Sequence, residues 1–535
     1  MRKQKIIDQL INIGYSLTTE KNFDKLMEGI LLGAKDLSNA DGGTLYLQTE
    51  DKKHLKFMVV QTDSLGIKMG GTNGEISWDP LSLTKKDGKQ NREQVAALCA
   101  IDGNLINIPD VYEVDDFNFE GTKAFDSGTG YRTKSMLVVP MRNHENDVIG
   151  VLQLLNKHDD DKNTIDFTKE DENLILSMSS QAAVAITNTK LIEGLENLLN
   201  SFIQSIATAI GEKSAYTGGH INRVAEVASM IANAINEDQD EYKDINFTPD
   251  EIKEIVTAAW LHDIGKITTP EYVVDKATKL ETIYDRINTV SAKFEILKRD
   301  IEIKYLKDTI NAKTQEEKDF LTKEYEEELS QIENNFEFVC TSNTGGEFMA
   351  DEKIQRIESI ASKIVQIEGK DINILTQNEV YNLSIRKGTL TEEERKVINN
   401  HVTVSYNMLQ KLPFPKKLKD VPLIAASHHK TARTDENGTH QGYGASEIMA
   451  VPMSIKDKLL AIADVFEALT ASDRPYKKAN SLNQSMKILS FMAKDNDLDK
   501  DLVKFFVKAD LHNKYAKKHL DESQMDEITV DFDSI

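Results

Sequence analysis

The chain has little of what marks secreted, disulfide-bonded or membrane-spanning proteins. Its 535 residues include only two cysteines, Cys99 and Cys340, too few for a disulfide framework. No apolar stretch approaches the roughly 20 residues that cross a bilayer, and the N-terminal segment has no apolar core typical of a secretory signal. We therefore expect a cytoplasmic protein that does not insert into membranes directly.

Positive charge is also scarce. Lysine and arginine number 65 against 88 aspartates and glutamates, which gives a formal net charge of −23. Binding to a nucleic-acid backbone depends on clustered basic side chains that displace counterions. We therefore expect no nucleic-acid partner. The length and the 40% hydrophobic content predict several globular units with real cores.

Eleven histidines are present, and five of them lie in segments suited to a buried metal site. Mixed imidazole and carboxylate ligands favour first-row divalent transition metals. An aspartate directly after a ligating histidine, as in His262-Asp263, can use its two oxygens to join two ions, and paired ions can clamp a phosphoryl group. The pattern predicts a hydrolase with a two-ion site. The candidate ligands are His220, His262, Asp263, His401, His428, His429 and Asp464.

Five strings around these residues together resemble the HD-GYP branch of the HD phosphohydrolase superfamily. They are AYTGGHINRVA (215–225), WLHDIGKITTP (260–270), INNHVTVSYNML (398–409), AASHHKTAR (425–433) and AIADVFEALTASDRPYK (461–477). Members of that family are metal-dependent phosphodiesterases of cyclic dinucleotides, chiefly c-di-GMP. The resemblance implies two iron or manganese ions that share Asp263.

The resemblance also assigns roles to individual residues. One ion would take His220, His262, Asp263 and Asp464, and the other Asp263, His401, His428 and His429. Glu212 is the candidate ligand of a third ion. Lys266 would neutralise phosphate charge or protonate the leaving oxygen. Arg474 and Lys477 of the DRPYK string would hold a phosphate.

One departure from the family is an insertion. His401 lies 138 residues after Asp263, where relatives need only a few tens. VVDKATKLE (273–281) and SIRKGTLTE (384–392) resemble each other and a single family segment, which places the insertion at 282–383. The insertion has no proline and is broken by CTSNTGGEF (340–348), which predicts a long helical hairpin. A dimer arm, a lid and a solvated charged surface all remain open.

A second departure follows the paired histidines. Lys430 stands where relatives have an acidic residue, and the loop KTARTDENGTHQ (430–441) delays Gly442-Tyr443-Gly444, where Gly-Tyr-Pro is typical. We expect Tyr443 to contact substrate. We also expect hydrolysis of c-di-GMP with relaxed discrimination, so that cyclic GMP-AMP is cut as well. The alternatives are a receptor that binds cyclic dinucleotides without cutting them, and a phosphohydrolase of another phosphoester.

Residues 1–190 alternate between helical and strand-like patterns. The strand-like runs include GTLYLQ (43–48), LKFMVVQ (55–61) and SMLVVPM (135–141). FDSGTGYRTKSMLVVPM (125–141), with Thr129 and Arg132, resembles the ligand-side segment of GAF domains in cyclic-nucleotide phosphodiesterases. The N-K-x(n)-F-x3-D-E pattern of those domains matches Asn156, Lys157, Phe167, Asp171 and Glu172.

This resemblance implies a GAF sensor domain with cyclic AMP or cyclic GMP as its regulator. It also implies that Lys157 and Asp171 brace the pocket lid and do not touch the nucleotide. The alternative is that the motif only secures the GAF fold.

The segment 173–212 predicts a connecting helix. It has no proline, and Ile192, Leu195, Leu199, Phe202, Ile206 and Ala209 recur in steps of three and four. This spacing favours a coiled-coil seam and a parallel homodimer with a signalling helix. A helix packed on its own domain is the alternative.

The sequence thus predicts a multidomain chain. It comprises an α/β GAF domain with an antiparallel sheet (1–190), a long connecting helix (173–212) and an all-α HD-GYP domain (213–535) with a helical-hairpin insertion (282–383).

Overall fold

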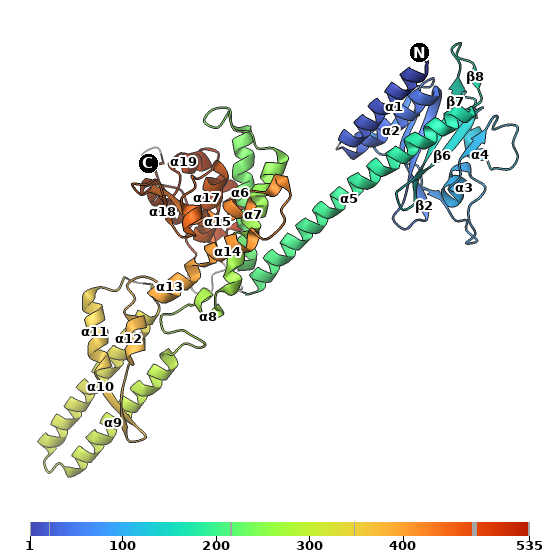
Figure 1. Ribbon diagram of the computed structural model, residues 1–535. Coiled ribbons are helices and arrows are strands. Elements are labelled where there is room, and N and C mark those ends of the chain that lie inside the picture. Colours follow the sequence, from blue (N-terminus) through green and yellow to red (C-terminus); the bar gives the residue numbers. More distant parts are fainter. Residues whose placement is uncertain (1, 21, 214–216, 347, 473–478, 533–535) are drawn as a thin grey trace. The chain divides into compact units, whose positions relative to one another are not determined.

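The computed structural model describes residues 2–20, 22–213, 217–346, 348–472 and 479–532. The chain divides into two compact units, Met1–Leu199 and Asn200–Ile535, whose elements are labelled in Figure 1. Over the described ranges, no helix combines the length and the hydropathy needed to cross a bilayer.

An antiparallel sheet forms the centre of the first unit. Its main strands lie in the order β3-β2-β1-β7-β6-β5, while β4 pairs with β2 and β8 with β7. Leu45 and Leu47 face one core and Tyr46 the other, as the two-residue period of a strand requires. The strands are β1 (Ala40–Gln48), β2 (His54–Thr62), β3 (Ile67–Gly70), β4 (Leu81–Ser82), β5 (Ile106–Ile108), β6 (Met136–Arg142), β7 (Val148–His158) and β8 (Thr164–Ile165).

Helices cover both faces of this sheet. Buried side chains of α2 and of the first part of α5 fill the core on one face, and those of α3 fill the core on the other. The predicted combination of an antiparallel sheet with helices is confirmed. The helical elements are α1 (Arg2–Thr19), α2 (Phe23–Ser38), η1 (Gly71–Asn73), α3 (Val95–Asp102), α4 (Glu120–Thr129) and α5 (Lys169–Lys213).

The predicted connecting helix is α5, which is 45 residues long (Figure 1). The division between the units falls inside it, after Leu199. Its middle section has apolar side chains that are more than half exposed: Leu191, Ile192, Leu195, Leu198 and Phe202. Single exposed apolar residues are common, but five within twelve positions form a continuous uncovered stripe on this helix.

The second unit is mostly helical, as predicted. Helix α6 packs against α7 and α17, and α15 packs against α7 and α14. A short hairpin of β11 and β12, which the sequence analysis did not predict, follows the paired histidines. Outside the insertion the elements are α6 (Thr217–Glu237), α7 (Pro249–Leu261), η2 (Ile264–Thr268), α8 (Glu271–Val274), α13 (Glu392–Asn399), α14 (His401–Leu409), η3 (Lys416–Leu418), α15 (Val421–Ala426), β11 (Lys430–Thr434), β12 (His440–Gly442), α16 (Ser446–Met449), α17 (Ile455–Thr470), α18 (Leu482–Lys494), α19 (Lys500–Lys508), α20 (Leu511–His519) and η4 (Glu522–Gln524).

The segment expected as an insertion has its own small apolar core. It contains α9 (Ile287–Asn311), α10 (Gln315–Asn343), α11 (Asp351–Ala361), β9 (Ile364–Ile367), β10 (Lys370–Asn373) and α12 (Gln377–Leu383). Helices α9 and α10 form the predicted hairpin, and α10 ends inside the expected break. The turn of the hairpin, however, lies at 312–314. Thr314 and Glu317 form a capping box there that starts α10.

The hairpin of β9 and β10 within this segment was not predicted. Its two-residue turn, Glu368-Gly369, has positive φ values of 54° and 74°. Such a turn matches the right-handed twist of the two strands it joins.

Candidate functional site

The seven candidate ligands converge in the second unit from segments far apart in the chain. All are buried except His429, which is partly exposed. His220 lies in α6, His262 and Asp263 at the end of α7, His401 at the start of α14, His428 and His429 just after α15, and Asp464 in α17. Although His401 lies 138 positions after Asp263, the two are therefore neighbours in space.

The first half of the cluster surrounds Asp464. Its Oδ1 lies 3.2 Å from Nε2 of His220 and 3.7 Å from Nε2 of His262. Oδ2 of Asp263 lies 3.4 Å from the same His262 nitrogen. His220, His262 and Asp464 each offer one ligand atom within 4.8 Å of the others, close enough for one ion.

The second half surrounds His401. Its Nε2 lies 3.3 Å from Oδ1 of Asp263 and 3.4 Å from Nε2 of His428. His401, His428 and His429 form a second group whose ligand atoms lie within 4.8 Å of one another. The two oxygens of Asp263 thus point to different halves, which is the arrangement that a carboxylate shared by two ions needs.

Backbone carbonyls orient three of the imidazoles. Nδ1 of His262, His401 and His428 donates to the carbonyl oxygen three residues earlier, at 2.7, 2.5 and 2.6 Å respectively. With the proton on Nδ1, the lone pair of Nε2 is directed into the cluster. Ligating histidines usually have such an outer partner, which fixes the tautomer and the ring.

A cation fits the centre of this cluster. Nε2 of His262 and Oδ1 of Asp263 are buried acceptors without a hydrogen-bond partner in the described parts of the chain. Buried polar groups without partners are costly, and a metal ion would satisfy both. The donor set therefore fits a pair of divalent transition ions.

The protonation states agree with this interpretation. Burial lowers the pKa of His401 to about 4 and the pKa of His428 well below its usual value, so both rings are neutral at pH 7. Burial opposes charge on His220 too, but hydrogen bonds to Asp464 and Glu467 raise its pKa to about 9. Neutral imidazole is the ligating form, and the carboxylates that raise the pKa of His220 are groups that would also attract a metal cation.

Lys266 borders the cluster. Burial opposes the charge of Asp263, but Lys266 and His262 outweigh it and hold the pKa of that carboxyl well below its usual range. Nζ of Lys266 lies 2.6 Å from Oδ2 of Asp263, and its side chain is about one-fifth exposed. A ligand anion at the cluster could therefore reach this ammonium group.

Two residues that the sequence analysis missed hold the ligands in place. Glu467 is fully buried and pairs through one oxygen with Nδ1 of His220 and through the other with Nε of Arg223, at 2.5 Å in the latter case. Ser405 accepts from the Gly265 N–H and donates to the His262 carbonyl, both at 2.9 Å. Glu467 lies one helical turn after Asp464, and that spacing was a usable signal.

Glycine is required at position 265 of the HDIGK string. A Cβ there would lie 2.0 Å from the backbone oxygen of His401. The close approach of η2 to α14 brings Asp263 and His401 together.

The loop after the paired histidines places Tyr443 next to His429. The two rings are 5.9 Å apart in an edge contact, and Tyr443 is 46% exposed. Lys430 instead points inward, where its Nζ donates to the carbonyls of Ile448 and Val451 and ties the loop to α16. Two predicted phosphate contacts, Arg474 and Lys477, lie outside the described residues, as does the side chain of Glu212.

The first unit has a cavity of about 520 Å³ between the sheet and helices α3 and α4. Tyr46, Phe57 and Trp78 form an aromatic wall. Among the described residues that line the cavity, Glu120 is the only charged one. The first turns of α3 and α4 also border the cavity, so backbone N–H groups without an acceptor inside the helix lie at its edge; in α4 the Glu120 N–H donates to Oδ1 of Asn118 at 2.9 Å.

The five motif residues of the first unit brace the fold and do not line this cavity. Lys157 and Asp171 form a buried ion pair, and the same Asp171 oxygen accepts from the Thr168 N–H at 2.6 Å. The remaining contacts are Asn156 with the backbone of Arg132 and Lys134, and Asn107 with Glu172 and the Phe167 carbonyl.

The two predicted residues of the ligand-side segment have local partners. Thr129 donates to the Phe125 carbonyl at 2.7 Å within α4, and Arg132 pairs with Asp110 at 3.1 Å over the ring of Tyr112. Neither lines the cavity.

Comparison with known families assigns both units. Residues 22–186 match the GAF domain family, and residues 217–335 and 376–502 each match an HD domain family. The chain therefore carries a GAF domain followed by HD-domain sequence, as predicted. The two HD matches contain all seven candidate ligands.

Similar curated proteins are cyclic-nucleotide phosphodiesterases. The dual 3′,5′-cyclic-AMP and -GMP phosphodiesterase 11 of Drosophila melanogaster is 35% identical over 123 residues, which are 23% of this chain and 8% of that protein. A cGMP-specific 3′,5′-cyclic phosphodiesterase of Drosophila erecta is 28% identical over 206 residues, which are 37% of this chain and 17% of that protein. The matched segments thus span less than a fifth of these relatives.

Solved structures with similarity to this chain include a GAF domain and a reductase. The GAF domain of an Acinetobacter phosphoenolpyruvate-protein phosphotransferase covers 36% of this chain and 98% of its own, at 16% identity and a TM-score of 0.27. The free methionine-R-sulfoxide reductase of Neisseria meningitidis covers 35% and 91%, at 13% identity and a TM-score of 0.26.

Proposed function

We propose that this protein is a metal-dependent phosphodiesterase of the HD-GYP type that hydrolyses a cyclic dinucleotide under the control of its GAF domain. The observation that carries the proposal is the two-part cluster whose halves share Asp263. The HD-domain matches support it. The cyclic-nucleotide phosphodiesterases among the relatives support the same reaction class.

Two divalent ions, iron or manganese, would occupy the cluster. His220, His262 and Asp464 would hold one, His401, His428 and His429 the other, and Asp263 both. Glu212 is the candidate ligand of a third ion. When bound, such ions polarise phosphoryl oxygens and lower the pKa of water, which is the chemistry that phosphodiester hydrolysis needs.

The chain's own groups would bind and orient the substrate. Lys266, partly exposed beside Asp263, would place its ammonium against a phosphate oxygen and stabilise the charge that develops there. Tyr443, exposed beside His429, would stack on a base. Arg474 and Lys477 would hold the second phosphate.

The substrate we propose is c-di-GMP, with cyclic GMP-AMP as a second. The segment 430–441, most of which forms the β11–β12 hairpin, displaces the Gly-Tyr-Gly segment from its place in the family pattern, so discrimination between bases should be weakened more than the phosphate chemistry.

The GAF cavity would bind cyclic AMP or cyclic GMP. Its aromatic wall suits a planar base. Since no basic side chain lines the described cavity, we propose that backbone N–H groups in the first turns of α3 and α4 bind the phosphate. The exposed apolar stripe on α5 would pair with that of a second copy in a parallel homodimer and carry the signal.

Initial rates on a panel of phosphoesters test the proposal. The full chain, loaded with Mn²⁺ or Fe²⁺, is assayed on c-di-GMP, cyclic GMP-AMP, c-di-AMP, cyclic AMP, cyclic GMP and a phosphomonoester, with Asp263→Asn as the control. We expect comparable rates on c-di-GMP and cyclic GMP-AMP, and rates lower by about 100-fold or more in the control. Turnover of the monoester alone would indicate a different phosphohydrolase. Tight binding of a cyclic dinucleotide without turnover would indicate a receptor.

A further inference from the structure

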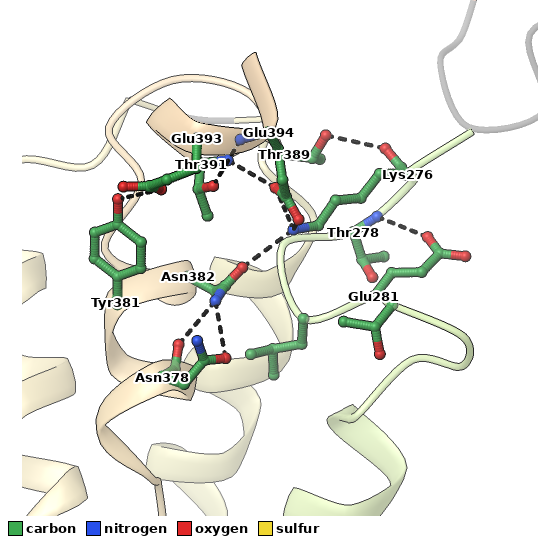
Figure 2. A network of polar contacts seen from close by, with 12 residues as sticks. Lys276, Thr278, Glu281, Asn378, Tyr381, Asn382, Thr389, Thr391, Glu393 and Glu394 are labelled. Atoms are coloured by element: carbon green, nitrogen blue, oxygen red, sulfur yellow. Dashed lines mark hydrogen bonds and ion pairs between the residues drawn. The ribbon is translucent and has the colours of Figure 1, made fainter. Parts of the chain in front are cut away.

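The two similar segments that flank the insertion lie side by side. Segment 273–281 precedes the insertion and segment 384–392 follows it, and Figure 2 shows the polar network between them and their neighbours. The Thr389 hydroxyl donates to the carbonyl of Lys276 at 3.0 Å. Nζ of Lys279 donates to the carbonyls of Leu383 and Ile385 at 3.0 and 2.8 Å. The insertion thus begins and ends at one place, which we call the neck and which comprises segments 273–281 and 384–392.

Only one of the two matching lysines is buried in this neck. The Lys276 side chain is completely buried, and its Nζ donates to both carboxylate oxygens of Glu394 at 2.9 and 2.8 Å and to Oδ1 of Asn382 at 3.1 Å. Lys387, at the matching position of the second segment, is exposed. Three acceptors around one buried ammonium make a directional joint, since leaving that charge unpaired would be costly.

The partner of Lys276, Glu394, lies in the helix that precedes the candidate metal ligand His401. It completes the capping box that starts α13, where it accepts from the Thr391 N–H at 2.8 Å. Helix α13 ends at Asn399, two positions before His401, and its Ile398 carbonyl is the acceptor that orients the His401 ring. A shift of α13 would therefore move this imidazole.

On the Lys276 side of the Lys276–Glu394 pair, the chain leads back to Asp263. Lys276 follows α8, which packs against α13, and α8 follows η2, whose first turn carries Asp263 and Lys266. The Lys276–Glu394 pair consequently joins the two stretches of chain that supply the shared carboxylate and the second half of the cluster. It lies at the point where the insertion enters and leaves.

We propose that Lys276 and Glu394 are positioning residues through which the neck of the insertion fixes His401 for the second metal ion. The inference rests on the proposed function and deepens it. It connects the insertion chiefly to the second half of the cluster, because His401 follows α13, whereas the first half takes His220 from α6, His262 from the end of α7 and Asp464 from α17.

Manganese binding to the full chain tests this role without reference to turnover. Free Mn²⁺ is followed by electron paramagnetic resonance during titration of the wild type, Lys276→Met and the matched control Lys387→Met. We expect two ions in the wild type and the control. In Lys276→Met we expect an unchanged first ion and a second ion bound about 10–100-fold more weakly, the range for loss of an outer partner of a ligand. Lys276→Arg, which keeps the charge, should restore part of the affinity.

A second variant guards against simple misfolding. Lys276→Met combined with Glu394→Leu removes both charges, so it should melt close to the wild type while the second ion stays weak. Wild-type binding of both ions in this variant and in Lys276→Met would overturn the inference alone. Equal weakening of both ions would overturn it too, as a general loss of stability. A wild-type chain that binds no Mn²⁺ would overturn the proposed function together with this inference.

Discussion

The GAF domain and the HD cluster both bury charged side chains, but they satisfy them differently. In the GAF domain, Lys157 and Asp171 neutralise each other, and a backbone N–H completes the carboxylate. In the HD cluster, His262 and Asp263 each keep a buried acceptor atom without a hydrogen-bond partner among the described residues. A buried charged side chain whose partners are all present is typical of a group that stabilises the fold. Buried acceptor atoms that face one another without a donor indicate a place for a cation.

The comparison therefore separates two kinds of motif. The GAF pattern was recognised through residues that brace the sheet and α5 and that lie outside the cavity. The HD pattern was recognised through the residues that would perform the chemistry. Changes to the first should affect stability and ligand affinity, and changes to the second should affect metal and turnover.

Breaking the GAF pair should have the largest effect on stability. Asp171→Asn leaves Lys157 buried without its counter-charge, so we expect a loss of about 3–5 kcal/mol in the unfolding free energy of the GAF domain. Cyclic-nucleotide affinity should fall and metal content should not change. Denaturant unfolding, calorimetry with cyclic AMP and cyclic GMP, and metal analysis measure these effects. Asp166→Asn, an exposed neighbour, is the control; equal destabilisation by both changes would argue against the buried pair.

Removing the shared carboxylate of Asp263 should affect turnover more than stability. Asp263→Asn retains the shape but loses the charge that offsets two divalent ions, so hydrolysis of c-di-GMP should fall by about 100-fold or more. The metal-free variant should lose less stability than Asp171→Asn, because Lys266, the cation paired with Asp263, is about one-fifth exposed and can be hydrated, whereas Lys157 is buried. Initial rates and thermal melts measure both, with the exposed Asp244→Asn as control. Activity near the wild type would contradict the two-ion cluster.

A change at Glu467 should distinguish the two halves of the cluster. Glu467→Gln removes the charge that orients His220, so the first ion should bind about 10–100-fold more weakly while the second is unaffected. This is the opposite selectivity to Lys276→Met. Titration with Mn²⁺ measures it, and weakening of the second ion alone would reverse our assignment of the two halves.

The smallest effect on folding is expected from the stripe on α5. Leu195→Gln combined with Phe202→Gln should convert a dimer to a monomer while changing the unfolding free energy by no more than about 0.5 kcal/mol per residue, because both side chains are already exposed. Sedimentation velocity of the wild type and the variant measures this. A monomeric wild type would leave the stripe without the proposed role.

The sequence was sufficient where local chemistry specifies geometry. The five strings that resemble the HD-GYP family predicted seven side chains that the structure brings into one cluster, although His401 is remote in sequence. The absence of proline and the break at 340–348 predicted a helical hairpin in the expected insertion, and α9 and α10 form one. The antiparallel GAF sheet was recognised from its strands and motif residues.

Other features depend on tertiary contacts that one string does not encode. The partnership of Glu467 with His220 joins residues that are 247 positions apart, and the spacing of Glu467 after Asp464 places it near the cluster without indicating which side chain it contacts. The hairpin turn was placed at a glycine-rich break, although the capping box of Thr314 and Glu317 marks a helix start. The Glu368-Gly369 turn was overlooked because its flanking strands have only four residues each.

Metal stoichiometry tests the central claim most directly. The full chain and Asp263→Asn are each equilibrated with Fe²⁺ or Mn²⁺, freed of unbound ions and analysed by mass spectrometry for metal per chain. We predict two tightly bound ions in the wild type and a joint loss of both in the variant. A wild type without bound metal, or an Asp263→Asn chain that keeps two ions, would contradict a cluster built on the shared carboxylate.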